Sequence, residues 1–296
     1  MALQRTAHDA CSRKVHCVRK NYLDDPFVSF FAKDETIVNS PLMNRGTWLR
    51  TMAIENCVKG FAATAGQPIQ VINFGAGVDT LFFRLKRANP NFSVKKFVEL
   101  DFADLVAEKE RVIRSHKELS SLVQSEYVIL PCNLYDSKGV TEALKKHLQC
   151  GVPTLMLAEM VFVYIEGSVT TELLKTVMTD VIGAGTNTML VTYDAIQPFD
   201  RFGKVMVENL QQFGADFKGI KDFPTPEAHA QRCKDLGFKT VRALTMKSLY
   251  LSVPRKLQIG LNKLEMIDDW DEWNLMHEHY CFVAASTEDA PLPNFF

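Results

Sequence analysis

The sequence predicts an α/β fold with a mostly parallel sheet, and three observations lead to that prediction. Short apolar runs alternate with longer segments of helical spacing, which is the rhythm of parallel strands joined by crossover helices. Several of these runs end directly in polar or acidic residues, as strands do where they leave a buried sheet. The chain has 296 residues, 47% of them hydrophobic, which is enough for a substantial core.

The expected strands follow one another along the chain, and two helical blocks interrupt their order. The strands occupy residues 69–74, 95–100, 127–130, 154–158, 188–193, 239–245 and 279–284, with a helical stretch between the last two. Residues 1–66 form an expected N-terminal helical lid, with helical spacing from Ala10 to Gly66 and a local break at Arg45-Gly46. The main domain spans 67–285, with a helical insertion at about 200–236 (Asp200 to Phe213, then Pro226 to Leu236), and 286–296 is expected to be a flexible tail.

Composition excludes several classes of protein. The net charge is -1 and the pI is near 6.7, so nothing favours a nucleic-acid or membrane-surface partner. The seven cysteines occur singly, which argues against a disulfide framework or zinc ribbon and favours a reducing compartment. No run approaches the roughly 18 apolar residues of a membrane span, and no heptad pattern is visible. We therefore expect a cytoplasmic monomer that contacts neither membrane nor nucleic acid.

A glycine loop follows the first expected strand. Gly75 and Gly77 lie in Asn73-Phe74-Gly75-Ala76-Gly77, directly before a helical segment that begins near Thr80. Glycine permits a tight strand-to-helix turn and lets a ligand approach the main chain without a Cβ in between. The third glycine of the dinucleotide fingerprint is replaced by Thr80, so the loop alone indicates only a bound ligand or a simple turn.

Polar residues at the next three strand ends narrow the identity of the ligand. Asp101, at the exit of the second strand, can accept hydrogen bonds from the hydroxyls of a ribose, although it could also cap a helix. Asn133 follows the third strand, where its amide can pair with adenine or shape a turn. Glu159 ends the fourth strand, and a carboxylate there suits the positive amino or sulfonium end of a cofactor. Together these residues point to S-adenosylmethionine rather than a nicotinamide nucleotide, which does not require the acid at the fourth strand.

Other familiar sites are not predicted. The chain contains neither a G-x-S-x-G elbow nor an H-E-x-x-H helix. His277, His279 and Cys281 alternate along a late expected strand, where packed or edge positions are favoured over a metal site. No metal is therefore expected.

Taken together, the motifs resemble the leucine carboxyl methyltransferases, over most of the chain. The resemblance rests on Arg19-Lys20-Asn21-Tyr22 with Asp25-Pro26, Asn44-Arg45-Gly46-Thr47-Trp48-Leu49-Arg50, the glycine loop with Asp79-Thr80, Leu157-Ala158-Glu159 with Val163-Tyr164, and Asp200-Arg201-Phe202-Gly203 with Glu208-Asn209-Leu210. It implies a Rossmann-like S-adenosylmethionine-dependent methyltransferase fold, with an added N-terminal helical lid and a helical insertion before the last strands. It further implies methylation of the C-terminal leucine carboxylate of the protein phosphatase 2A catalytic subunit, which regulates phosphatase holoenzyme assembly.

The resemblance also implies roles for individual residues. Arg50 would grip the cofactor carboxylate, which suits a bidentate guanidinium, while Asn133 and Leu134 would flank adenine in a place where the family often has Asp-Leu. Lys20 and Tyr164 would hold the incoming substrate carboxylate. Gly75, Gly77, Asp101 and Glu159 would keep the cofactor contacts derived above, and the product would be S-adenosylhomocysteine.

Three alternatives remain at this stage. A related carboxyl or O-methyltransferase acting on a small molecule or on a modified tRNA base would share the cofactor motifs. A nicotinamide-dependent oxidoreductase could use a similar sheet, and a non-catalytic module could retain the cofactor pocket.

Overall fold

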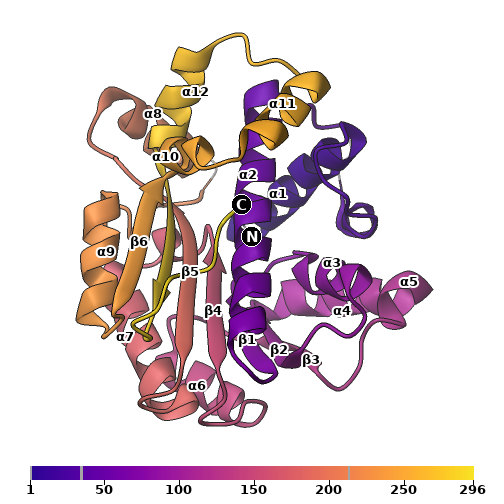
Figure 1. Cartoon of the computed structure of the whole chain (residues 1–296), viewed down its shortest axis with the longest axis vertical. Coiled ribbons are helices and arrows are strands. Elements are labelled where there is room, and N and C mark those ends of the chain that lie inside the picture. The colour runs from indigo at the N-terminus through magenta and orange to yellow at the C-terminus, as the bar shows by residue number, and fades with distance from the viewer. Residues whose placement is uncertain (1, 34–35, 213) are drawn as a thin grey trace.

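The computed structural model of the protein describes residues 2–33, 36–212 and 214–296, and its centre is a seven-stranded sheet (Figure 1). All seven expected strands are confirmed, with ends at most two residues from the predicted ones. They are β1 (Ile69–Phe74), β2 (Val94–Asp101), β3 (Tyr127–Pro131), β4 (Thr154–Glu159), β5 (Thr188–Ala195), β6 (Thr240–Thr245) and β7 (Tyr280–Ser286).

The strand order is β3-β2-β1-β4-β5-β7-β6. Strands β1 to β5 are parallel to one another, and β7 pairs antiparallel with both β5 and β6. From β1 the chain adds β2 and β3 on one side. It then crosses back and adds β4 on the other side of β1. Such a reversal leaves a crevice at the carboxyl ends of the central strands, where open α/β sheets bind ligands.

Helices cover both faces of the sheet. Alternate residues of each central strand enter separate cores: Val71 and Leu155 face one, and Ile72 and Met156 face the other. This is the burial expected of strands covered on both sides. The crossover helices are α3 (Leu81–Ala88), α4 (Ala103–Ser115), α5 (Lys117–Ser120), α6 (Ser137–Lys145), η2 (Phe162–Tyr164), α7 (Gly167–Val177) and the π-helical turn η3 (Met178–Ile182).

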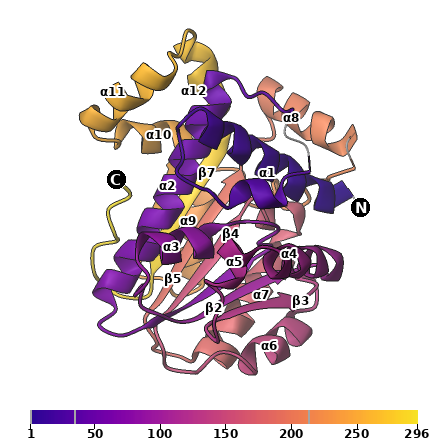
Figure 2. The same ribbon diagram turned by 90° about the vertical axis from the view of Figure 1, so that its right-hand side faces the viewer.

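Two long helices, α1 (Ala2–Arg19) and α2 (Pro41–Thr64), pack side by side, with the short η1 (Val28–Phe31) between them in sequence (Figures 1 and 2). The expected break at Arg45-Gly46 is wrong, because α2 runs through it uninterrupted. A glycine inside a helix costs about 1 kcal/mol. Here buried contacts offset that cost, since the Arg45 guanidinium donates to Tyr250 Oη (3.2 Å), Asn262 Oδ1 (2.8 Å) and the Glu265 carbonyl (2.7 Å).

The remaining helices lie late in the chain. The predicted insertion contains α8 (Arg201–Gln212) and α9 (Pro226–Asp235), while α10 (Met246–Leu251), α11 (Arg255–Leu264) and α12 (Trp270–Glu278) separate β6 from β7. Phe213, the expected end of the first inserted segment, lies outside the described residues. Figure 1 shows α8, α10, α11 and α12 gathered at one end of the molecule, near the start of α2.

The tail after β7, expected to be flexible, instead packs along α2. Phe295 is 2% exposed, its carbonyl accepts a hydrogen bond from Asn56 Nδ2 (2.7 Å), and the Phe296 ring stacks on Trp48 at 5.5 Å between centroids. Buried aromatic side chains contribute a large apolar contact area, so they can hold a segment in place that has no regular secondary structure. Among the described residues, no helix is long and apolar enough to cross a membrane.

Candidate active site

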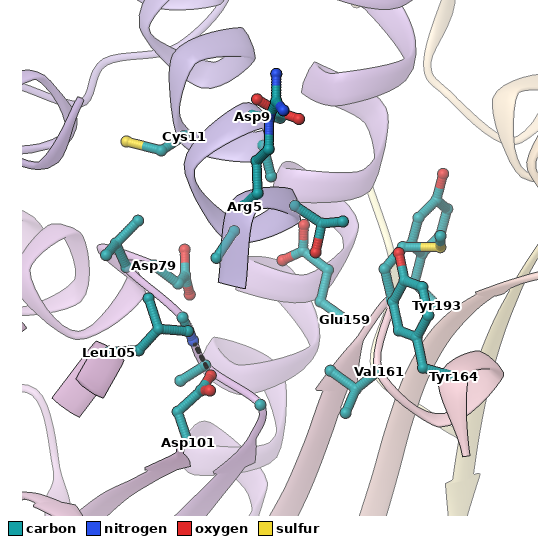
Figure 3. Close-up of a pocket in the computed structure, with 18 of the residues that line it drawn as sticks. Arg5, Asp9, Cys11, Asp79, Asp101, Leu105, Glu159, Val161, Tyr164 and Tyr193 are labelled. Carbon is teal, nitrogen blue, oxygen red and sulfur yellow. Dashed lines mark hydrogen bonds between the residues drawn. The ribbon is translucent and has the colours of Figure 1, made fainter. Parts of the chain in front are cut away.

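A cavity of about 680 Å³ lies at the carboxyl ends of the central strands, roofed by α1 and bordered by α2. Its volume falls within the range of about 300–1,000 Å³ that is usual for small-molecule sites. Figure 3 shows Asp79, Asp101 and Glu159 around this space, with Arg5 and Asp9 of α1 above them and Tyr164 and Tyr193 to one side.

The structure brings almost all of the predicted site residues to this cavity. The predicted residues among those that line it are Arg50, Gly75, Gly77, Asp101, Asn133, Leu134, Glu159 and Tyr164. Strand register explains the convergence, because Phe74 pairs with both Leu100 and Ala158. The residues that follow these three therefore emerge side by side at one edge of the sheet. Lys20 is the exception and does not line the cavity.

The glycine loop has the backbone that its composition predicts. Gly75 (φ +59°) and Gly77 (φ +53°) are both in the left-handed region that favours glycine. A Cβ on Gly75 would lie 2.6 Å from Val161 Cγ2, and one on Gly77 would lie 3.0 Å from Ala7. Since Val161 and Ala7 both line the cavity, the missing side chains keep its floor open.

Asp101 is held beside this loop. Its Oδ2 accepts a hydrogen bond from the Gly77 N–H (2.6 Å; dashed in Figure 3), and its Oδ1 accepts one from the Phe102 N–H (2.7 Å). Burial raises the pKa of this carboxyl, and the two backbone donors oppose the rise. The carboxylate is thus oriented at the tip of β2 with lone pairs still available to a ligand.

Glu159 lies between two cations, one from each N-terminal helix. Arg50 Nε is 2.8 Å from Glu159 Oε1, but its N–H is not aligned for a hydrogen bond, so the contact is an ion pair. Lys14 Nζ is 3.5 Å from Glu159 Oε2. Burial is the largest influence on the pKa of Arg50 and lowers it, but Glu159 and Tyr193 together with Cys17 raise it by more, so the net shift is upward. The guanidinium also lies over the Tyr193 ring, 5.1 Å from its centroid.

Lys14 is a site residue that sequence reasoning missed. It is 6% exposed, lines the cavity, and donates to Asp79 Oδ1 at 3.0 Å. A signal was present, because Lys14 shares a helix face with the apolar residues Cys11, Val15 and Val18. A lysine on an apolar stripe needs a partner, but the sequence does not reveal that the partners lie on β4 and in the glycine loop.

A buried charge network fixes the segment after the glycine loop. Asp79 contacts Lys14, Arg84 Nη1 is 3.8 Å from the same carboxylate oxygen, and Lys109 Nζ donates to the Asp79 carbonyl (2.6 Å). Burial favours a raised pKa for Asp79, but these cations outweigh it and the pKa is strongly lowered. Arg84 also pairs with Glu55 Oε2 (3.0 Å) on α2. The loop is therefore tied to α1, α2 and α3 at once.

The remaining predicted residues differ in their surroundings. Lys20 is 48% exposed and lies 3.3 Å from Glu265 Oε1, away from the cavity. Tyr164 sits against Phe217, with ring centroids 5.2 Å apart, and burial raises its pKa to about 12, so its phenol is neutral at pH 7. Asn133 is exposed at the rim of the cavity, and its Oδ1 accepts from the Tyr135 N–H (3.1 Å).

The Asp200-Arg201-Phe202-Gly203 segment begins α8 and does not line the cavity. Asp200 Oδ1 caps α8 by accepting from the Gly203 N–H (2.7 Å), and its Oδ2 contacts His279 Nε2 (2.9 Å). A Cβ on Gly203 would lie 1.9 Å from the Gln197 carbonyl, so only glycine fits there. His277 is on α12 and not on a strand as expected. No cluster of metal ligands occurs within residues 2–33, 36–212 and 214–296.

These residues fit S-adenosylmethionine. The open glycine floor suits a ligand that approaches the backbone, the Asp101 carboxylate suits a ribose, and Glu159 suits a cationic group. The Arg50 Nε–H, buried and without a hydrogen-bond acceptor, has capacity for a carboxylate.

Solved structures with a similar fold are those of methyltransferases. A proposed methyltransferase from Thermobifida fusca has a similar structure, with a TM-score of 0.56 and 12% sequence identity over 82% of this chain and 81% of that chain. At this identity the similarity establishes the fold alone, which is the methyltransferase α/β fold expected from the sequence.

Sequence comparison is more specific. The family model described as leucine carboxyl methyltransferase matches residues 2–178. Leucine carboxyl methyltransferase 1 of Schizosaccharomyces pombe is 28% identical, covering 98% of this chain and 96% of its own length. The human tRNA wybutosine-synthesizing protein 4 is 29% identical over 97% of this chain, but only 44% of its own length is covered. The chain belongs to the leucine carboxyl methyltransferase family and is an S-adenosylmethionine-dependent carboxyl methyltransferase.

Proposed function

We propose that this protein methylates the C-terminal leucine carboxylate of the protein phosphatase 2A catalytic subunit, and thereby regulates assembly of the phosphatase holoenzyme. The observation that carries the proposal is the set of apolar side chains among the residues that line the cavity. They include Met43, Leu210, Met276 and Tyr280, which suit an aliphatic leucine better than a polar base. We further propose that the protein acts as a monomer in the cytoplasm and that the phosphatase tail is its partner.

The cofactor contacts are part of the same proposal. Asp101 would hold the ribose, Asn133 and Leu134 would flank adenine, and Gly75 and Gly77 would lie beneath the ligand. Arg50 would bind the cofactor carboxylate, and Glu159 the neighbouring positive group. Lys20 was expected to hold the substrate carboxylate. In this scheme Lys14 takes that place, because Lys14 lines the cavity and Lys20 pairs with Glu265 outside it.

The mechanism follows from the charge of the acceptor. A C-terminal carboxylate has a pKa of about 3.5, so it is already a nucleophile at neutral pH and needs no general base. When bound, the cofactor supplies a methyl group on a sulfonium. The protein's task is to hold one carboxylate oxygen in line, and such positioning can contribute on the order of 7–11 kcal/mol. Tyr164, a neutral phenol at the cavity wall, would donate a hydrogen bond to the incoming carboxylate.

Two assays test this function. In the first, the protein is incubated with labelled S-adenosylmethionine and the phosphatase catalytic subunit, with and without its terminal leucine. Transfer that requires the leucine supports the proposal, whereas transfer that persists without it refutes the substrate assignment. Label appearing only on a parallel sample of tRNA would favour the function named for the human relative. If the protein bound NAD and not S-adenosylmethionine, the identification of the cofactor would be wrong.

In the second assay, calorimetry measures cofactor affinity. Arg50→Ala should weaken it at least tenfold, since the variant loses a charge-assisted contact worth roughly 1.5–3 kcal/mol. Lys20→Ala is the matched control, because it removes a cation of the N-terminal segment that does not line the cavity. Unchanged affinity in Arg50→Ala would overturn the assigned role.

A further inference from the structure

The turn that follows β4 combines an unusual backbone with residues of the cavity wall. Met160 comes directly after Glu159 and has a φ of +53°, a left-handed conformation that costs free energy in a residue other than glycine. Val161 and Tyr164 follow, and both line the cavity (Figure 3). A strained backbone persists only where its surroundings hold it, so neighbouring groups must fix this turn.

Asp194, near the end of β5, supplies such a group. Its Oδ1 accepts a hydrogen bond from the Val163 N–H at 3.1 Å, and the Val161 N–H makes a second contact with the same carboxyl. Val163 is the second residue of the short helix η2, and the first N–H groups of a helix have no acceptor within it. Asp194 therefore caps η2 from another strand, as an acidic N-cap residue does from within its own segment.

Glu159, at the start of the turn, is fixed independently of this contact. It pairs with Tyr193 in the sheet, and the Met160 N–H donates to the Tyr193 carbonyl at 2.6 Å. Strand pairing thus sets the backbone as far as Met160. The carboxyl of Asp194 acts on the part beyond it, which leads to Tyr164 on the proposed substrate side.

Asp194 costs folding free energy in this position. It is 2% exposed, and its Oδ2 is buried without a hydrogen-bond partner among the described residues. Burial raises its pKa to about 7, although the Val163 N–H and Arg232 lower it. An incompletely paired buried carboxyl is unfavourable, and residues that break a rule of stability are expected where function or strain requires them.

We propose that Asp194 is a positioning residue for methyl transfer: through the N–H groups of Val161 and Val163 it holds Tyr164 where the phenol meets the incoming carboxylate. The inference rests on the proposed function, because it assumes that Tyr164 donates to that carboxylate. Tyr164 is the residue after Val163, so a relaxed turn would displace its side chain. A misplacement of about 1 Å can lower a rate on the order of a hundredfold.

The first test removes the acceptor and compares a variant that keeps it. Asp194→Leu deprives the Val163 N–H of its partner, whereas Asp194→Asn retains an oxygen that can accept. With the phosphatase catalytic subunit as methyl acceptor, kcat/KM should fall at least about tenfold in Asp194→Leu and stay within about threefold of the wild type in Asp194→Asn. An equal fall in both variants overturns the proposal. Cofactor affinity, measured by calorimetry, should change less than about threefold in either, because strand pairing holds Glu159.

A double-mutant cycle separates positioning from a general loss of structure. In the Tyr164→Phe background the hydroxyl is already absent, so Asp194→Leu should lower kcat/KM by less than about threefold further. A smaller folded fraction would instead lower the rate by the same factor in both backgrounds, and that result overturns the proposal. Asp194→Ala also lacks the acceptor and takes the place of the Leu variant if that variant does not fold.

Amide hydrogen exchange examines the turn independently of any substrate. Measured by NMR relative to the amides of β1, exchange of the Val163 N–H should be roughly tenfold faster in Asp194→Leu and close to the wild-type rate in Asp194→Asn. Unchanged exchange in the Leu variant overturns this inference while the proposed function stands. If the wild-type enzyme transfers no methyl group to the leucine terminus, the proposed function fails and the role in methyl transfer fails with it, whatever the exchange rates.

Discussion

Replacing Lys14 by Met should cost far more stability than replacing Lys20 by Met, although the two lysines lie near each other in sequence. Lys14 is 6% exposed and contacts Asp79 at 3.0 Å and Glu159 at 3.5 Å. Removing one partner of a buried ion pair typically costs 3–5 kcal/mol, because the remaining charge stays buried. Asp79 keeps Arg84 and Glu159 keeps Arg50, so we expect the lower end of that range, about 3 kcal/mol.

Lys20 provides the matched control. Its side chain is 48% exposed and 3.3 Å from Glu265, and an ion pair of this kind contributes about 0–1 kcal/mol. Urea unfolding at pH 7 without cofactor measures both losses, and calorimetry then measures cofactor affinity, which should fall only in Lys14→Met. Burial lowers the pKa of Lys14, but Asp79 and Glu159 together raise it by more, so the pKa lies above its usual 10.5. Its contribution is therefore complete at neutral pH and is lost only as pH rises through the raised value.

The difference between the two variants should consequently be the same at pH 6 and pH 9. Equal losses in the two variants, or a larger loss in Lys20→Met, would refute the assignment of Lys14 to a buried network. A large loss of stability in Lys14→Met with unchanged cofactor affinity would confine its role to structure.

Three further predictions concern the loop, a buried acid and the tail. Gly75→Ala should weaken cofactor binding at least tenfold, whereas Gly66→Ala, equally strained at φ +69° but with open space around it, should not; calorimetry of both variants decides. Burial raises the pKa of Asp194 to about 7, so folding takes up a proton and wild-type stability falls as pH rises from about 4 to 7. Asp194→Asn keeps the acceptor for the Val163 N–H and should flatten this dependence of stability on pH. At pH 8 the variant should be up to about 4 kcal/mol more stable than the wild type, at 1.4 kcal/mol per pKa unit. A pH dependence of unfolding that is the same in both proteins would contradict the raised pKa of Asp194. Phe295→Ala should lower the free energy of unfolding by about 3–5 kcal/mol and leave cofactor affinity unaltered, whereas a flexible tail would show no loss.

The strands and the cofactor edge were predictable because their signals are local. A buried strand is a short apolar run, and its end is marked by the first polar residues, as after Leu100 and Ala158. Once the sheet is parallel, its geometry alone brings Gly75, Asp101 and Glu159 to one edge. Neither step requires knowledge of residues that are distant in sequence.

The helical additions were less predictable, because their residues depend on distant partners. The sequence suggested a break at Gly46, but Arg45 anchors that turn to residues more than 200 positions away. The tail was expected to be flexible, yet Phe295 is buried beneath Arg242 and its carbonyl is bonded to Asn56 of α2. In both places tertiary contacts outweighed local preference.

By itself, the sequence determined the α/β class, the positions of the seven strands, the glycine loop and the acids that follow it, since each of these is a short-range pattern. Only the tertiary structure decided the strand order, the burial of Lys14 beside Asp79 and Glu159, and the placing of His277 against Gly46. The physical reason is that a lone charge or lone pair acquires its role from a partner, and the partner of Lys14 is 65 residues away along the chain but 3.0 Å away in space.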